Sequence, residues 1–469
     1  MKKFTWILLS MLLFGDLVYT FSQYYQTPLD GDLPAIVTPT EPYEKVLTSP
    51  FGEDVIFQKK VYPATNRFFT HAFMYWYFRN VPVYLQRMVS PIDSPYLACA
   101  ILKMLTELLL LYLFYVYIKG RKTIDFKDFV VISLIVVPFF QTYGYQATMG
   151  IVNAPITYFC FYSLTSVLFL VPFIPFFLKI MHDEKTNLGF FSKIIIIALL
   201  LVLSLTSSLL PSISIIICPI ILFFAWKKEE GSYFEKTIKL CKSDYVLLLI
   251  LLIFSVYSSY LGLFNRENFG ETIPLLERYA RIPKALFRLL TLKLGLTLLI
   301  VALIINVRLI KKFFENEKSS KIIGVINWAT IFTVLYIVLI PLGGYREYRP
   351  DVVGKDVLTP ILIILIFCYT LSTYFLVNSD FKYKNKYLMG VICISIIFTL
   401  PDFSNYEDYK CERNAFEQIS MSKDSIVVLE NQCNVMEWHK KTKVENSESR
   451  AKLLQIWNIT KENKLFYQK

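Results

Sequence analysis

Charged residues are scarce in this chain. Asp, Glu, Lys and Arg account for 18% of its 469 residues, whereas about a quarter is usual in a soluble protein. Histidine is rarer still, and His71, His182 and His439 lie too far apart in the sequence to indicate a histidine pair or a His/Cys metal site. The sequence also lacks a Walker A loop, a dinucleotide-binding fingerprint and zinc-ligand spacing. The sequence therefore contains no motif that would identify it as a nucleotide-dependent or zinc-dependent enzyme.

Apolar blocks dominate what is present. Hydrophobic residues make up 55% of the sequence, and the blocks are about 20 residues long, the length of helix that crosses a bilayer core. Runs such as 194–203 are continuous rather than alternating, which argues against a transmembrane barrel. The sequence therefore predicts an all-α integral membrane protein with about eleven transmembrane helices. The predicted spans are 4–22, 96–118, 128–146, 153–179, 192–208, 211–226, 244–263, 288–308, 321–341, 356–377 and 387–400.

Lysines indicate how these spans are oriented. The net charge is +12, and much of the lysine falls in short loops between apolar blocks, such as 119–127 and 227–242. Cytoplasmic loops carry this excess of positive charge, so the basic composition is explained without a nucleic-acid partner. We predict a multi-pass protein of the bacterial inner (plasma) membrane with a cytoplasmic N-terminus. Residues 1–400 would form the transmembrane domain and 401–469 a small, soluble, extracytoplasmic tail.

The first gap between spans is too long and too polar to be a plain connector. It carries Asp30 and Asp32, separated by one glycine, and then Glu53 and Asp54. Two carboxylates this close accept a proton, hold a divalent cation, or raise one another's pKa by repulsion. We therefore name Asp30 and Asp32 as candidate catalytic residues and all four acids as candidate ligands of a divalent cation. The alternative is an ordinary solvated turn, because Asp and Gly both favour turns.

The same large extracytoplasmic loop, residues 23–95, is rich in aromatic residues. They crowd the stretch 66–90, where Arg67, Arg79 and Arg87 punctuate them. The stretch is too polar to span a bilayer and suits a helix lying in the interface, with its rings at headgroup level. Such a helix either walls a groove for a lipid-linked substrate or serves as a membrane anchor alone.

Two later outside loops favour arginine over lysine, against the usual charge rule. Tyr345 is followed by Arg346 and Arg349, and an earlier loop carries Arg278 and Arg281 at the same three-residue spacing. One turn of helix or a tight loop aims such a pair the same way, and arginine forks match phosphate oxygens. These five residues are our candidate substrate-binding group. The alternatives are salt bridges to neighbouring acids and a solvated helix face.

The second predicted span contains two charged residues. Lys103 and Glu107 are four positions apart, so they can pair on one helix face. Charges inside a bilayer are costly, and they usually pair or line a cavity. We expect either an ion pair that orients the helices or a functional role facing a cavity.

The tail shows a short predicted strand at 425–429 and two cysteines, Cys411 and Cys433. If the tail lies outside the cytoplasm, these cysteines either form a disulfide or stay free, because separation in sequence does not fix their geometry. The tail contains no recognisable catalytic motif.

A first span, a large extracytoplasmic loop with an acid soon after the membrane, interfacial helices and then many spans resemble the GT-C class of membrane glycosyltransferases. In motif, the resemblance covers the Asp-Gly-Asp at 30–32 and, loosely, the arginine loops. It implies a transferase that moves a hexosyl or pentosyl group from a polyprenyl-phosphate donor to an envelope glycan or lipid acceptor. Asp30 or Asp32 would then be the general base or metal ligand, and Arg346 and Arg349 would hold the lipid phosphate.

Two other functions fit the same layout. An O-antigen-type polysaccharide polymerase or ligase also uses outside arginine loops, but its large loop would lie in the middle of the chain or later. A non-enzymatic transporter or flippase of lipid-linked sugars would show an inverted repeat and paired broken helices. The sequence shows no such repeat, and the large loop directly follows the first span, so we rank the glycosyltransferase first.

Overall fold

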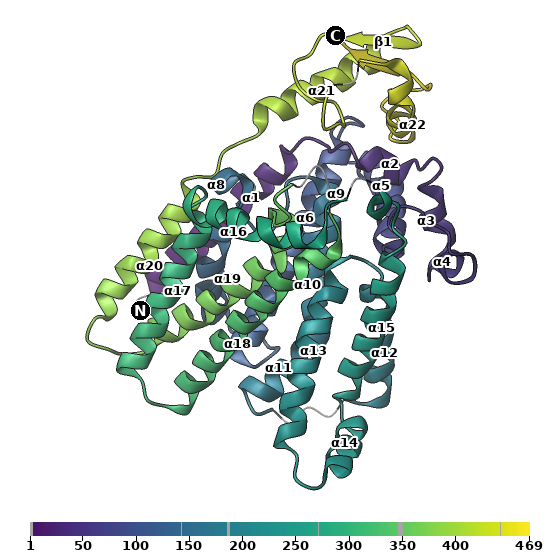
Figure 1. The fold of residues 1–469 in the computed structure, drawn as a ribbon. Helices are drawn as coiled ribbons and strands as arrows, with labels where there is room; N and C mark the ends of the chain where they lie inside the picture. Colours follow the sequence, from purple (N-terminus) through teal and green to yellow (C-terminus); the bar gives the residue numbers. More distant parts are fainter. Residues whose placement is uncertain (1–2, 142, 185–187, 271, 346–349, 441) are drawn as a thin grey trace.

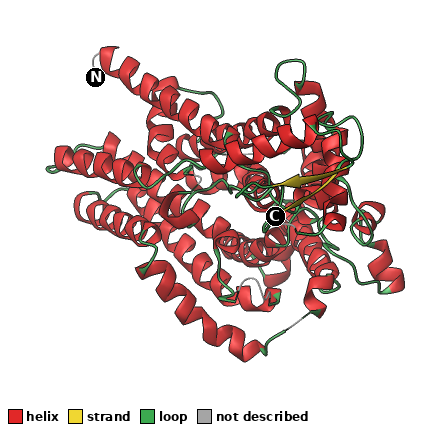
Figure 2. Cartoon of the chain, turned by 90° about the horizontal axis from the view of Figure 1, so that it is seen from above, coloured by secondary structure: helices red, strands yellow, loops and turns green. Residues whose placement is uncertain are grey.

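The computed structural model describes residues 3–469 except 142, 185–187, 271, 346–349 and 441. The chain folds into a bundle of helices with a small two-stranded sheet in its tail (Figures 1 and 2). The first half contains α1 (Lys3–Tyr25), α2 (Leu33–Val37), α3 (Glu44–Thr48), α4 (Glu53–Gln58), α5 (Phe68–Leu85), α6 (Ser94–Lys119), α7 (Phe126–Val136), η1 (Val137–Phe139), α8 (Gly144–Ala147), α9 (Ile156–Tyr158), the π-helix η2 (Phe159–Leu164), α10 (Thr165–Leu170), η3 (Val171–Phe173), α11 (Ile174–Met181), α12 (Phe190–Ser204), α13 (Leu209–Lys228) and α14 (Tyr233–Lys242). The second half contains α15 (Val246–Gly262), η4 (Arg266–Phe269), α16 (Leu275–Thr291), α17 (Gly295–Phe313), α18 (Glu317–Leu339), η5 (Ile340–Gly343), α19 (Lys355–Asn378), α20 (Lys384–Thr399), α21 (Tyr406–Met421), β1 (Ile426–Leu429), η6 (Val444–Ser447), α22 (Glu448–Ile456) and β2 (Leu465–Gln468).

The apolar blocks become helices long enough to cross a membrane. Within the described residues, six helices meet both the length and the hydropathy that a span requires, or seven if α16 and α17, which meet at a 78° bend, count as one. The apolar helices α12 and α15 are shorter. The multi-pass helical membrane fold is thus confirmed, whereas the total of eleven spans stays a prediction.

Helices α6 and α19 form the centre of the bundle. Of the most apolar stretch of α19, 83% is buried, against 11% for α1 at the periphery. The end of α6 is set locally: Gly120 has φ +72°, a left-handed conformation that glycine adopts without steric cost. A Cβ there would lie 2.6 Å from the His182 ring, so the turn also needs the missing side chain.

Ion pairs hold together the loops at one end of the bundle, which we call the lysine end. Lys119 pairs with Asp128 at 2.6 Å, and Lys193 pairs with Asp244 at 2.8 Å. The helix α14, with its own lysines, lies at this end (Figure 1). The lysine-rich loops therefore gather as the sequence predicted, although which side of a membrane they face stays a prediction.

The opposite end, which we call the site end, carries the first loop, α8, α16 and the tail (Figure 1). Helix α5 forms within the predicted aromatic stretch and packs on α6, where Tyr77 OH donates to Ala98 O at 3.0 Å. Two hydrogen bonds dock the tail onto α5: Trp457 Nε1 donates to Phe78 O at 2.7 Å, and Gln86 Nε2 donates to Trp457 O at 2.6 Å. An ion pair between Arg413 and Asp93 adds to this contact at 2.7 Å.

The predicted strand in the tail is confirmed as β1, which pairs in parallel with β2 in the register Ile426 to Leu465. The structure also decides between paired and free cysteines in the tail, which the sequence left open: Cys411 and Cys433 form a disulfide. This bridge closes the chain between α21 and the turn that follows β1.

Candidate functional site

Asp30 lies in the turn between α1 and α2, which we call the acid loop (residues 29–33). Its side chain is buried, and its carboxylate accepts hydrogen bonds from Thr157 N at 2.8 Å and Thr157 Oγ1 at 2.7 Å. Closer in sequence, it accepts from Asp32 N at 3.0 Å and Leu33 N at 3.2 Å. Burial raises the pKa of Asp30, and these hydrogen bonds partly oppose the rise. The contacts of Asp30 thus fasten the acid loop to α9.

Asp32 stands in a different environment, because its side chain is half-buried rather than enclosed. Burial raises its pKa to about 6, and the negative charge of Asp30 adds to the rise. Hydrogen bonding to Trp438 and the positive charge of Arg450 act in the opposite direction. Asp32 is therefore ionised at neutral pH with a proton affinity raised toward that of a general base.

The tail lies directly against the acid loop at Gly31. A Cβ at this glycine would lie 2.9 Å from Trp438 N and 2.9 Å from Glu437 Oε1. Real side chains do not approach so closely, so glycine is required for the tail to dock here. The half-buried carboxylate of Asp32 therefore lies close to the junction between the first loop and the tail.

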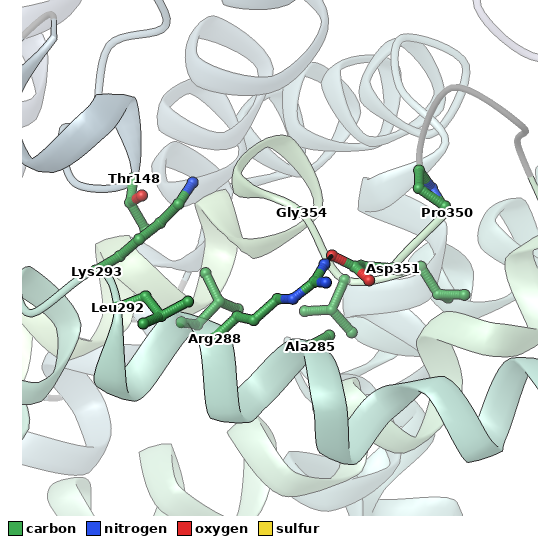
Figure 3. A pocket seen from close by; sticks show the side chains of 11 residues that line it. Thr148, Ala285, Arg288, Leu292, Lys293, Pro350, Asp351 and Gly354 are labelled. Carbon is green, nitrogen blue, oxygen red and sulfur yellow. Dashed lines mark hydrogen bonds and ion pairs between the residues drawn. The ribbon is translucent and has the colours of Figure 1, made fainter.

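A second feature of the site end is a cavity of about 410 Å³ beside α16, which we call the cation pocket. Figure 3 shows its lining side chains, with Arg288 and Asp351 in contact and with Lys293 and Thr148 at the same end of the cavity. The lining residues are Thr148, Ala285, Arg288, Leu289, Leu292, Lys293, Pro350, Asp351, Val352, Val353 and Gly354. Positive charge at the rim and aliphatic walls together suit a ligand with an anionic head and an apolar chain.

The polar groups of the cation pocket differ in how far they are already satisfied. Arg288 Nη1 donates to Asp351 Oδ2 at 2.6 Å, so part of its charge is neutralised. Lys293 has no hydrogen-bond or ion-pair partner among the residues described. The buried Thr148 hydroxyl, within the same described set, also lacks a partner. An ammonium and a hydroxyl are thus available to an anion.

The backbone that closes this pocket is strained. Val352 has φ +59°, in a region that β-branched residues rarely adopt, and Val353 N donates across it to Asp351 O at 2.6 Å. Strain of this kind concentrates at functional sites, where the surrounding structure enforces it.

One segment, residues 148–157, joins the acid loop to the cation pocket. Thr157 holds Asp30 at one end, and Thr148 lines the pocket at the other. Between them, Asn153 Nδ2 donates to Asp356 Oδ1 at 2.8 Å, two residues beyond the pocket wall. Nine residues span at most about 32 Å even when fully extended, and the first loop, α8 and α16 lie at the same end of the bundle (Figure 1).

The predicted arginine group is brought together in part. Arg281 donates to Pro350 O at 2.9 Å, and its guanidinium lies over the Tyr345 ring, 5.4 Å from the centroid. Arg278 donates to Ile273 O at 3.0 Å and to Pro341 O at 3.2 Å. These contacts fasten α16 to the loop that follows η5. Arg346 and Arg349 lie outside the described residues, so their phosphate-binding role stays a prediction.

The four candidate metal ligands have separate partners. Glu53 accepts from Ser49 Oγ at 2.8 Å, and Asp54 pairs with Lys45 at 2.7 Å. Over the described part of the chain, no three His, Cys, Asp or Glu side chains gather in a group that suits a metal ion. Asp30, Asp32, Glu53 and Asp54 therefore do not form one cluster here.

Lys103 and Glu107 do not form the ion pair that was expected inside the second span, so that expectation is wrong. Lys103 Nζ donates to Ala154 O at 2.6 Å, and Glu107 accepts from Tyr24 OH at 2.9 Å. Residues 103 and 107 lie on one helix face, but both side chains find partners on neighbouring segments, which the spacing along α6 does not reveal. Lys103 thus supports the segment between the acid loop and the cation pocket.

Sequence reasoning missed Arg288, Lys293 and Thr148. Arg288 is seven residues after Arg281 and so falls on the same face of α16, a signal that the spacing did contain. Thr148 carries no such signal, because its place follows from the fold of residues 148–157. No protein-family model, curated protein or solved structure matches this chain.

Proposed function

We propose that the protein is a membrane glycosyltransferase that moves a sugar from a polyprenyl-phosphate donor to an envelope glycan or lipid acceptor. The observation that carries the proposal is the cation pocket: a cavity of about 410 Å³ with Arg288 and Lys293 at its rim and aliphatic walls, at the same end of the bundle as Asp32. The lysine and arginine suit the phosphate, and the leucine and valine side chains suit the first prenyl units.

The proposed reaction needs a base and an anion site, and the site end offers both. Asp32 accepts the proton of the acceptor hydroxyl, whose oxygen attacks the anomeric carbon of the donor. The bond from that carbon to the phosphate oxygen breaks, and polyprenyl phosphate leaves with the bonding electron pair. Lys293 and Arg288 stabilise the negative charge that gathers on the phosphate as the bond breaks.

The test is sugar transfer by the purified full-length protein in lipid nanodiscs, with a polyprenyl-phosphate hexose as donor. Replacing Lys293 with Gln is expected to raise KM for the donor at least about tenfold. The change removes a positive charge that would bind the donor phosphate and that has no other partner among the described residues of the pocket. Lys284→Gln is the matched control and keeps the wild-type KM, because Lys284 is an exposed cation on α16, the helix that ends just before Lys293.

Replacing Asp32 with Asn is expected to lower kcat about 100-fold or more, the usual contribution of a general base. Because the base must be ionised, wild-type kcat/KM falls as pH drops through about 6, the pKa of Asp32, and the Asn variant loses this dependence. An unchanged donor KM in Lys293→Gln, together with an unchanged kcat in Asp32→Asn, would refute the proposal.

A further inference from the structure

The tail contributes an aromatic side chain to the site end that the proposed mechanism does not use. The rings of Trp438 and Tyr158 lie against one another, with centroids 5.4 Å apart and planes tilted by 33°. Trp438 is 37% exposed although it packs against the acid loop at Gly31. A large aromatic surface is thus left open beside the half-buried carboxylate of Asp32.

This tryptophan is held in place by contacts on both sides of its turn. Met436 N donates to Glu412 Oε1 at 2.8 Å, and Arg450 Nε donates to Met436 O at 2.9 Å. Asn434 Nδ2 donates to Trp438 O at 3.0 Å and closes the turn. We call residues 433–438 the tail turn.

The tail turn also carries backbone strain. Met436 has φ +46°, in the left-handed region that non-glycine residues rarely occupy. The contacts from α21 and α22 enforce that conformation, and the disulfide from Cys433 to Cys411 fixes the start of the turn. A strained backbone conformation costs free energy. Where it positions a solvent-exposed ring, as Met436 does for Trp438, it is typical of a binding site rather than of packing alone.

The geometry points to a sugar-binding subsite: we propose that Trp438 stacks on the apolar face of a pyranose ring of the acceptor while Asp32 accepts hydrogen bonds from its hydroxyl groups. An aromatic face offers a broad apolar surface at low cost in side-chain entropy. A carboxylate accepts hydrogen bonds from hydroxyl donors strongly, because its charge assists them. The two kinds of group match the two kinds of surface on a sugar ring.

A cation is the ligand against which the sugar must be tested. An aromatic ring beside a carboxylate also suits a quaternary ammonium group. The positive charge of Arg450 near Asp32 is paired with Glu437, so it does not repel such a ligand. Binding of tetramethylammonium is therefore included in the experiment as the opposing outcome.

This inference rests on the proposed function only in calling the bound sugar the acceptor. Its test measures saccharide binding and does not require glycosyl transfer. Full-length protein in nanodiscs is titrated with maltotriose, mannotriose and triacetylchitotriose, and binding is followed by saturation-transfer NMR without donor. We expect at least one saccharide to bind the wild type. Its affinity is expected to fall at least tenfold in Trp438→Ala and less than threefold in Trp438→Phe, which keeps an aromatic face.

Trp76→Ala is the matched control, since Trp76 is another exposed tryptophan and lies on α5. It is expected to bind as the wild type does, and melting curves of all variants confirm that they are folded. Unchanged saccharide binding in folded Trp438→Ala, no binding of any of the three to the wild type, or binding of tetramethylammonium instead would overturn the inference.

The two proposals can fail separately. Saccharide binding that depends on Trp438, without any sugar transfer from the lipid donor, would refute the glycosyltransferase proposal and support the sugar-binding subsite. Sugar transfer that depends on Asp32 and Lys293, with an unchanged acceptor KM in Trp438→Ala, would support the glycosyltransferase proposal and refute the sugar-binding subsite.

Discussion

The ion pairs of the lysine end and the buried carboxylates of the site end hold the chain in different ways. At the lysine end, side chains pair across loops while remaining partly open to solvent, as Lys193 does with Asp244. At the site end, carboxylates are buried and accept hydrogen bonds from backbone N–H groups, as Asp30 and Glu412 do. Exposed pairs contribute little to stability, whereas buried carboxylates organise several segments at once. The difference indicates that the geometry of the chain is fixed more firmly around the buried carboxylates of the site end.

The strongest test of this contrast is Asp30→Ala. The change removes the acceptor for three backbone N–H groups and one hydroxyl, and an unsatisfied buried donor costs about 1–3 kcal/mol. We expect the free energy of unfolding to fall by at least about 4 kcal/mol, measured by thermal denaturation in detergent micelles. Asp380→Ala is the control, because Asp380 is an exposed partner of Lys384. A matching stability of the two variants would contradict the contrast between the ends.

A smaller effect is expected from Glu412, which is measured against pH. Its carboxylate accepts from Leu29 N at 2.9 Å, Tyr96 OH at 2.8 Å and Met436 N, and burial raises its pKa from 4.5 to about 7. The folded state therefore binds the proton more tightly, so its contribution to stability is complete below pH 4.5. It is lost as pH rises through about 7, a change of about 3 kcal/mol.

Replacing Glu412 with Gln, which is neutral at every pH, should remove this dependence. The measurement is the melting temperature of both proteins between pH 4 and pH 8. A wild-type curve that is level across this range, or a variant that declines in parallel with the wild type, would contradict the expectation.

The smallest effect is expected at the lysine end. Lys193→Ala removes the ion pair with Asp244, in which the lysine side chain is about one-third exposed. Pairs of this kind contribute about 0.2–1 kcal/mol, so the melting temperature should change little, and less still at high salt. A loss as large as that of Asp30→Ala would show that the two ends do not differ.

Much of the fold could be predicted from the sequence, because hydrophobic blocks and lysine loops report on local chemistry. The apolar runs formed helices, the lysine loops gathered at one end, and the strand formed in the tail at 426–429. Each of these features depends on residues near one another or on a simple rule of charge.

The site was predicted less completely. The sequence named the Asp-Gly-Asp turn, but it did not distinguish Asp30, which is enclosed by donors from α9, from Asp32, which remains half-buried. It also missed Lys293 and Thr148. Those differences arise from contacts between segments more than 100 residues apart, which neither spacing nor composition records.

The docking of the tail sets a time order for assembly. Trp457 contacts Phe78 across 379 positions of sequence, and every apolar span except the first lies between the two. At a synthesis rate of about 5–20 residues per second, the ribosome needs about 20 to 75 seconds to reach the tail after it has made α5. Through that interval Leu29 and Tyr96 have no Glu412 to bind, so the nascent chain must be protected from aggregation and proteolysis until translation delivers its last helices.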